Sequence, residues 1–182
     1  MKVILHRFTF QLIQIALLIC TITSCNVNLD SSNSKITIIE NFDKISHLSE
    51  IISIKEFKHK VIYIDIWGTG CSPCISEFKN LSELKKRYKD ENVVFLYLAK
   101  PYGLFPISKW KKEMHTYDLE GFHIYMSKEL ENNIYIEVPG IRQIGIPKYI
   151  LVNKKGIVAY PDAPRPSSRE ELYKCIDMLL ED

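Results

Sequence analysis

Two cysteines separated by two residues, Cys71 and Cys74, lie where a predicted strand meets a predicted helix. The preceding segment, 61–67, reads VIYIDIW, and its β-branched and aromatic residues are typical of a buried strand. From Cys74 to Lys89, apolar residues recur at spacings of three and four with Lys and Glu between them, which predicts an amphipathic helix. The pattern therefore places both thiols in the first turn of a helix.

That position favours an ionised thiol, because the first turn of a helix has unpaired backbone N–H groups and the positive end of the helix dipole. A free cysteine has a pKa of about 8.5, and sites of this kind lower that pKa. We therefore expect Cys71, the more exposed thiol, to attack, and Cys74 to displace the partner from the mixed disulfide. Pro73 between them would fix the local backbone.

Zinc binding and a purely structural disulfide are the two other uses of such a pair. A structural zinc site needs four ligands, and the sequence has no second Cys-x-x-Cys and no His-x3–5-His pattern. A disulfide that closes so short a loop stabilises a fold little, and its bond tends to be reducible. The sequence therefore favours a redox-active disulfide that works without a metal or another cofactor.

Residues 1–24 have the features of a secretory signal. A basic start precedes the mostly apolar run 8–22, which is shorter than the about 20 residues that a spanning helix needs. The segment 22–25, ITSC, is similar to a bacterial lipobox, so we expect Cys25 to carry lipid; a plain cleaved signal and an uncleaved anchor are the alternatives. Residues 25–35 would form a polar tether, and residues 36–182 one globular domain.

The charge of this domain gives no indication of nucleic-acid binding. Removing Lys2 and Arg7 with the signal leaves 22 basic residues, equal to the 22 acidic residues. Cys175 shares a predicted helix face with Leu172 and Leu179, which indicates a small core residue and not a third redox thiol.

The rest of the chain predicts a strand, a helix, a strand, an ambiguous stretch and a hairpin, at 93–98, 107–117, 121–126, 130–144 and 148–160. Ser108 is the expected cap of that helix, and Ser167 or Ser168 that of a final helix. This alternation predicts an α/β protein with a central mixed sheet covered on both faces.

A proline at the entry to a predicted strand, Pro147 after Ile146, is a second chemical landmark, because X–Pro is the bond at which the cis form is least unfavourable. Residues 36–182 resemble the thioredoxin superfamily. The resemblance rests on this proline and on 67–74 (WGTGCSPC), Glu77, 145–147 (GIP) and 149–156 (YILVNKKG). The resemblance is to the exported TlpA/ResA-like thiol-disulfide oxidoreductases of this superfamily.

This resemblance implies a thioredoxin-like three-layer α/β/α fold with an inserted strand near 122–126. It implies that Pro147 is cis beside the dithiol and that the Ile146 backbone pairs with an incoming substrate chain, with Trp67 as a further substrate-binding residue. It also implies thiol-disulfide exchange with exported protein partners in the reducing direction. A membrane thiol donor at the extracytoplasmic face of the cell envelope would then re-reduce the dithiol.

Two carboxylates are the remaining catalytic candidates. Asp65 lies where thioredoxins proper have a buried acid and many TlpA/ResA-like chains have asparagine. On an apolar strand its pKa should be raised, so that it could accept a proton from Cys74; the alternative is a strand-end Asp in water. Glu77 resembles the family's active-site glutamate, although helix glutamates are usually only solvated.

Two positions depart from the family pattern. Gly70 stands where Trp or another bulky residue usually precedes the first cysteine, which puts the partner-docking surface and the redox potential in doubt. Lys148 follows the proline where threonine is frequent, and it adds either a positive charge near the site or a solvated side chain.

Two other functions share this fold. A thiol peroxidase needs its cysteine in a Pro-x3-Thr/Ser-x2-Cys setting, which the segment 65–71, DIWGTGC, lacks. A non-catalytic binding lipoprotein would keep the fold and use the dithiol to hold a partner or a metal. The sequence favours the oxidoreductase.

Overall fold

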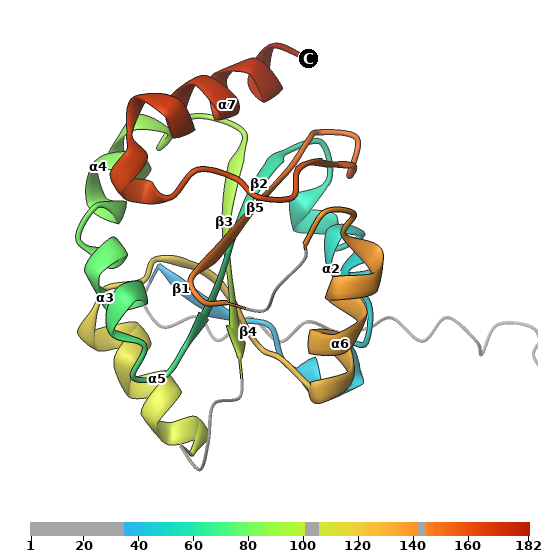
Figure 1. Cartoon of the computed structure of the whole chain (residues 1–182), viewed down its shortest axis with the longest axis vertical. Helices are drawn as coiled ribbons and strands as arrows, with labels where there is room; N and C mark the ends of the chain where they lie inside the picture. The colour runs from blue at the N-terminus through green and yellow to red at the C-terminus, as the bar shows by residue number, and fades with distance from the viewer. Residues whose placement is uncertain (1–34, 101–105, 142–144) are drawn as a thin grey trace, which may run out of the picture.

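The computed structural model describes residues 35–100, 106–141 and 145–182. Its strands are β1 (Ile36–Ile38), β2 (Val61–Gly68), β3 (Val93–Lys100), β4 (Gly121–Tyr125), β5 (Lys148–Val152) and β6 (Val158–Tyr160). They form one sheet with the order β1-β4-β3-β2-β5-β6 (Figure 1). The first four in this order pair in parallel, and β5 pairs antiparallel with both β2 and β6, which confirms the predicted mixed sheet.

Helices cover both faces of the sheet (Figure 1). One face carries α3 (Ser72–Phe78), α4 (Leu81–Arg87), α5 (Ile107–Thr116) and α7 (Glu170–Glu181), and the other carries α2 (Leu48–Ile52) and α6 (Lys128–Glu137). The short 3-10 helices are η1 (Phe42–Lys44), η2 (Lys55–Phe57) and η3 (Pro166–Ser168). The predicted three-layer α/β/α architecture is confirmed.

The central strand β2 is buried along its whole length. Because successive strand side chains point to opposite faces, Tyr63 and Trp67 enter the core under α3, α4, α5 and α7. Ile62 and Ile64 enter the core under α2 and α6. Burial on both faces explains why the β2 sequence is a nearly continuous apolar run.

The single helix predicted from Cys74 to Lys89 is two helices. α3 begins at Ser72, and the chain turns at Lys79 and Asn80 before α4 begins. In that turn the Asn80 backbone N–H donates to the Glu77 carbonyl at 2.9 Å. Both helices bury the same apolar face, so the spacing of apolar residues continues through the break and hides it.

Two predicted helix caps are wrong. α5 begins at Ile107 after Pro106, so Ser108 lies inside the helix. Ser167 and Ser168 lie in η3, and α7 begins after Arg169.

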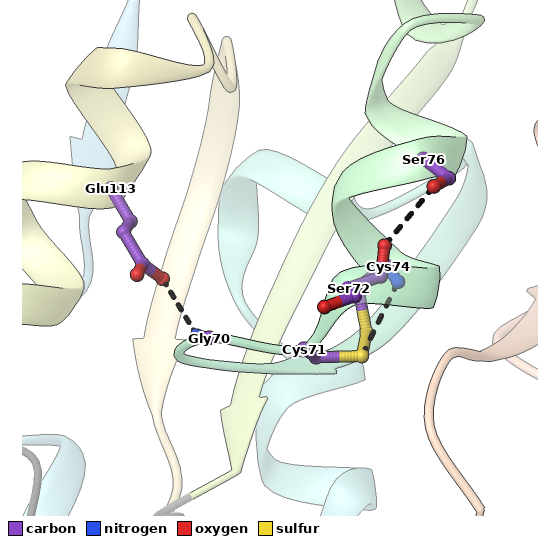
Figure 2. Close-up of a disulfide and its surroundings, with 6 residues drawn as sticks. All are labelled: Gly70, Cys71, Ser72, Cys74, Ser76 and Glu113. Carbon is purple, nitrogen blue, oxygen red and sulfur yellow. Dashed lines mark hydrogen bonds between the residues drawn. A yellow bond between two sulfur atoms is a disulfide. The ribbon is translucent and has the colours of Figure 1, made fainter.

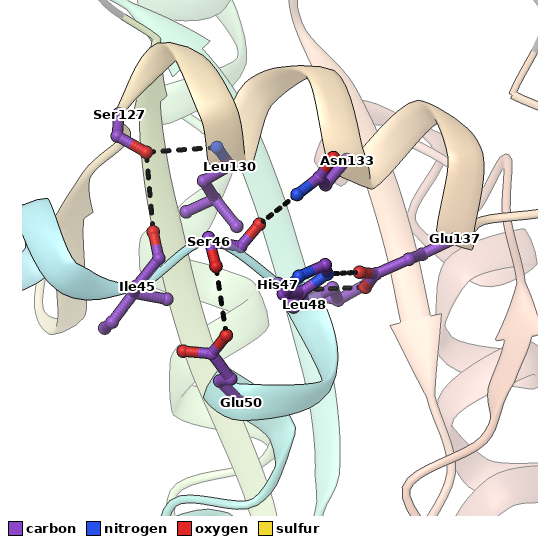
Figure 3. A network of polar contacts seen from close by, with 9 residues as sticks. All are labelled: Ile45, Ser46, His47, Leu48, Glu50, Ser127, Leu130, Asn133 and Glu137. Carbon is purple, nitrogen blue, oxygen red and sulfur yellow. Dashed lines mark hydrogen bonds and ion pairs between the residues drawn. The ribbon is translucent and has the colours of Figure 1, made fainter.

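The pattern missed β1 and α2 and left α6 ambiguous, and long-range contacts hold these elements. β1 pairs in parallel with β4. Glu137 at the end of α6 pairs with the His47 ring and accepts the Leu48 N–H at 2.8 Å, while the Asn133 amide donates to the Ser46 carbonyl at 2.9 Å (Figure 3). These contacts join segments about 90 positions apart, which a local pattern does not detect.

Candidate active site

The dithiol lies at the carboxyl end of β2, where the chain turns into α3. Cys71 is the N-cap of α3, and the Cys74 N–H donates to the Cys71 sulfur at 3.2 Å (Figure 2). Pro73 lies at the start of the helix, where its missing N–H loses no helical hydrogen bond. The two cysteines form a disulfide, with their Cα atoms 5.3 Å apart.

The two sulfurs differ in accessibility. Cys74 is fully buried, whereas Cys71 is partly exposed. An incoming disulfide can therefore reach Cys71 and is kept from Cys74. This supports the predicted order of attack by Cys71 and resolution by Cys74.

Asp65 is buried on the sheet face that α3 covers, with 2% of its surface exposed. The predicted burial is confirmed, and the alternative of an Asp in water is wrong. Burial raises the pKa of Asp65 well above its usual value; the charge of Glu77 adds to this shift and that of Lys85 opposes it. The register places Asp65 between Tyr97 of β3 and Tyr149 of β5. Neither carboxylate oxygen has a hydrogen-bond partner within the described part of the chain, so the neutral acid is favoured.

Glu77 is also buried and is not a solvated helix glutamate. Ser167 of η3 donates its backbone N–H to Glu77 Oε2 at 3.0 Å and its hydroxyl to Oε1 at 2.9 Å. The Arg165 guanidinium lies 3.6 Å from Oε1. Glu77 therefore fastens the segment before α7 to the active-site helix, and its catalytic role stays a prediction.

The Ile146–Pro147 peptide bond is cis, as the resemblance implies. β5 begins at Lys148, which pairs with Ile66 near the end of β2, so Pro147 lies at the dithiol end of the sheet. The Lys148 ammonium pairs with Asp162 at 2.6 Å, which accounts for its charge without a role in the site. Binding of a substrate chain at Ile146 and Pro147 stays a prediction.

Trp67 lies in the core and not on the surface. It is fully buried, and its ring packs edge to face against Phe78, with the centroids 5.4 Å apart. Its indole therefore packs against α3, the helix that carries the dithiol. A contact with substrate, predicted for Trp67, is not tested by this packing.

Glu113 is a neighbour of the dithiol that the sequence pattern missed. Its Oε2 accepts the Gly70 N–H at 3.2 Å, beside Cys71 (Figure 2). The two residues are 43 positions apart, and Glu113 lies on a helix whose surface is rich in charge. Without the fold, no sequence signal distinguishes it from a solvated helix residue.

Cys175, on α7, is a partly buried free cysteine that packs against the core, as predicted. Cys25, the predicted lipid anchor, lies outside the described residues, as do the signal and nearly all of the tether. No helix in the described ranges is long and apolar enough to cross a membrane. Over those same ranges, His, Cys, Asp and Glu form no group of three or more that could hold a metal ion.

Comparison with protein families gives a match to the family described as Redoxin over residues 39–174. A relative named Thiol-disulfide oxidoreductase ResA, from Bacillus thuringiensis subsp. konkukian, is 31% identical over 107 residues, 59% of this chain and 57% of the relative. A protein of the same name from Halalkalibacterium halodurans is 28% identical over 107 residues, 59% of this chain and 56% of the relative. The chain therefore spans little more than half the length of these curated relatives.

Solved structures with the same arrangement of elements include a candidate thiol-disulfide oxidoreductase from Bacteroides vulgatus. It is 32% identical, with a TM-score of 0.55 over 70% of this chain and 83% of that chain. A candidate thioredoxin from Neisseria meningitidis has a TM-score of 0.56 over 70% of this chain and 79% of that chain, and at 23% identity it supports the fold alone. These similarities agree with the thioredoxin-like architecture.

Proposed function

The chain belongs to the redoxin family, and from this premise we propose that it is a thiol-disulfide oxidoreductase that reduces disulfides of exported protein partners. One observation carries the proposal: the Cys71–Cys74 pair lies at the start of a helix, with Cys71 accessible and Cys74 buried. An accessible thiol paired with a protected one is the arrangement that thiol-disulfide exchange needs.

The reaction follows from this arrangement. The Cys71 thiolate attacks one sulfur of the partner's disulfide, forms a mixed disulfide and releases the other partner sulfur as a thiolate that takes up a proton. Cys74 then loses its proton and attacks the Cys71 sulfur, which releases the second partner thiolate. The partner gains two electrons and two protons, and the Cys71–Cys74 disulfide forms. No cofactor is needed, because the dithiol itself carries the electrons.

Asp65, when its carboxyl is ionised, is the proposed acceptor of the Cys74 proton. It is buried on the sheet face that α3 covers, and Cys74 belongs to the buried apolar cluster on that face. A carboxyl whose pKa is raised by burial matches a thiol better than one with an ordinary pKa. Glu77 adds negative charge near Asp65 and is the second candidate for moving this proton.

The partner would lie across the dithiol end of the sheet. The Ile146–Pro147 peptide precedes β5 at this end, and this position supports the proposal that the Ile146 backbone pairs with an extended substrate chain. Trp67 would affect partner binding indirectly, through α3, because its side chain is fully buried and packs against that helix.

The proposed location is the extracytoplasmic face of a membrane. A signal at 1–24, lipid on Cys25 and a polar tether at 25–35 would hold the domain near a membrane thiol donor that returns two electrons to the disulfide. The ITSC segment and the polar residues after it support this part of the proposal.

Insulin reduction tests the activity. With dithiothreitol as electron source, the purified protein should accelerate the reduction of insulin disulfides, and the Cys71→Ser/Cys74→Ser double variant should not. A wild-type protein that binds partners but gives no acceleration over the double variant would favour the non-catalytic binding protein.

A further inference from the structure

The contact between Gly70 and Glu113 joins the dithiol loop to a distant helix. Glu113 lies on α5, between β3 and β4, and its carboxylate accepts the N–H of the residue immediately before Cys71 (Figure 2). A carboxylate is thereby held against the residue that precedes Cys71 in the sequence.

Gly70 has the backbone conformation that accompanies this contact. Its φ is 75°, in the left-handed region that glycine adopts readily and that residues with a side chain rarely adopt. Gly70, which departs from the family pattern, is also the residue whose backbone N–H donates to Glu113 of α5.

The position of Glu113 is fixed by the packing of its helix. Trp110 and Met114, on the inner face of α5, are fully buried. The Trp110 ring packs against Phe42 and Tyr125, with ring centroids 6.2 Å and 5.3 Å away. Glu113 itself is partly buried, and its contact with Gly70 lies at the surface of the protein.

Two groups act on the Cys71 sulfur in opposite directions. The Cys74 N–H, which donates to it at 3.2 Å, stabilises a thiolate. The Glu113 carboxylate destabilises a thiolate, because like charges repel. A dithiol whose reduced, ionised form is poorly stabilised gives up its electrons more readily, the opposite of strong oxidants such as DsbA.

We propose that Glu113 is a positioning residue that holds the Gly70 backbone and makes the Cys71–Cys74 dithiol more reducing. The inference deepens the proposed function and rests on it. It names the residue that biases the exchange toward the transfer of two electrons and two protons from the dithiol to the partner's disulfide.

Two variants separate charge from geometry. In Glu113→Gln the side-chain oxygen still accepts the Gly70 N–H, but the charge is gone. In Glu113→Ala both are lost. Glu120→Gln is the matched control, because it also removes one carboxylate, and Glu120 precedes β4 at the opposite end of the parallel strands, paired with Lys35 at 2.8 Å.

The measurement is the equilibrium of each full-length protein with mixtures of reduced and oxidised dithiothreitol, together with the pKa of Cys71 from thiolate absorbance. Glu113→Gln should shift the equilibrium constant toward the reduced dithiol by roughly three- to tenfold, or about 15–30 mV less negative in potential. It should also lower the Cys71 pKa, and its unfolding midpoint should stay close to that of the wild type. Glu113→Ala should shift the potential at least as far.

An unchanged potential and an unchanged Cys71 pKa in Glu113→Gln, or a shift no larger than that of Glu120→Gln, would overturn the proposal. This equilibrium requires no protein substrate. A wild-type protein that fails to reduce insulin would therefore count against the proposed function, and the effect of Glu113 on the dithiol would still be measured separately.

Discussion

Ser167 donates both its backbone N–H and its hydroxyl to the carboxylate of Glu77, at 3.0 Å and 2.9 Å, across 90 positions of sequence. The carboxylate is buried, and hydrogen bonds to a charged group are stronger than those between neutral groups. The pair ties η3, and through it the start of α7, to the helix that carries the dithiol.

Ser167→Ala should lower the free energy of unfolding by about 1.5–3 kcal/mol, because it removes one hydrogen bond to a buried carboxylate. Urea unfolding measures the loss. Ser168→Ala leaves the Glu77 carboxylate untouched and should change stability by less than about 0.5 kcal/mol. Equal losses in the two variants would show that the Ser167 hydroxyl does not hold Glu77.

Asp65→Asn should change how stability depends on pH. The unfolded carboxyl ionises near pH 4, whereas burial raises the pKa of Asp65 well above that value in the folded protein. Between the two pKa values the folded state holds the extra proton, so the free energy of unfolding falls as pH rises. The variant lacks this fall and should be more stable at pH 7 by about 1–3 kcal/mol.

Urea unfolding of wild type and Asp65→Asn between pH 4 and pH 8 checks this, with the exposed Asp90→Asn as control. Stability curves that stay parallel over the whole range would contradict the raised pKa of Asp65.

The same Asp65→Asn substitution should slow resolution by Cys74 more than attack by Cys71, since the proposal assigns the Cys74 proton to Asp65. We expect about a 10²-fold effect, the low end for a positioned acid or base. Rapid-mixing kinetics separate formation of the mixed disulfide from its decay. Equal slowing of both steps, or of neither, would remove Asp65 from the mechanism.

The dithiol, the central strand and the cis proline could be predicted because each depends on a short, continuous stretch of sequence. The position of Cys71 follows from a buried strand that runs directly into a helix. The apolar neighbours of Asp65 in the sequence predict its burial. The partners of Glu77 and Gly70 could not be predicted, because Ser167 and Glu113 approach only through the tertiary fold. The break between α3 and α4 stayed hidden because the apolar spacing continues across it.

His47 should stabilise the fold in a pH-dependent way. Its hydrogen bond with Glu137 raises the pKa of His47 above the usual 6.5 (Figure 3). The stabilisation is therefore fully present below about pH 6.5 and is lost as pH rises through the raised pKa. The stability difference between wild type and His47→Gln should be largest near pH 6 and should shrink as pH rises through the raised pKa of His47. A difference that grows with pH would contradict this account.

Cys25→Ser should release a soluble protein or leave an unprocessed precursor, because Cys25 follows the apolar run and precedes the polar tether. Fractionation of cells that express the full chain, with Cys20→Ser as the matched control, provides the measurement. A Cys25→Ser protein that is still mature and membrane-bound would rule out lipid at this residue.

Trapping of mixed disulfides tests most directly that Cys71 attacks and Cys74 resolves. Cys74→Ser and Cys71→Ser, each reduced and then mixed with a disulfide-containing peptide, are examined by intact-mass spectrometry without reductant. We predict a stable one-to-one adduct with Cys74→Ser, because no nearby thiol displaces the peptide, and little adduct with Cys71→Ser, whose remaining thiol is buried. The reverse pattern would contradict the assignment of the nucleophile, and two inert variants would contradict the redox function itself.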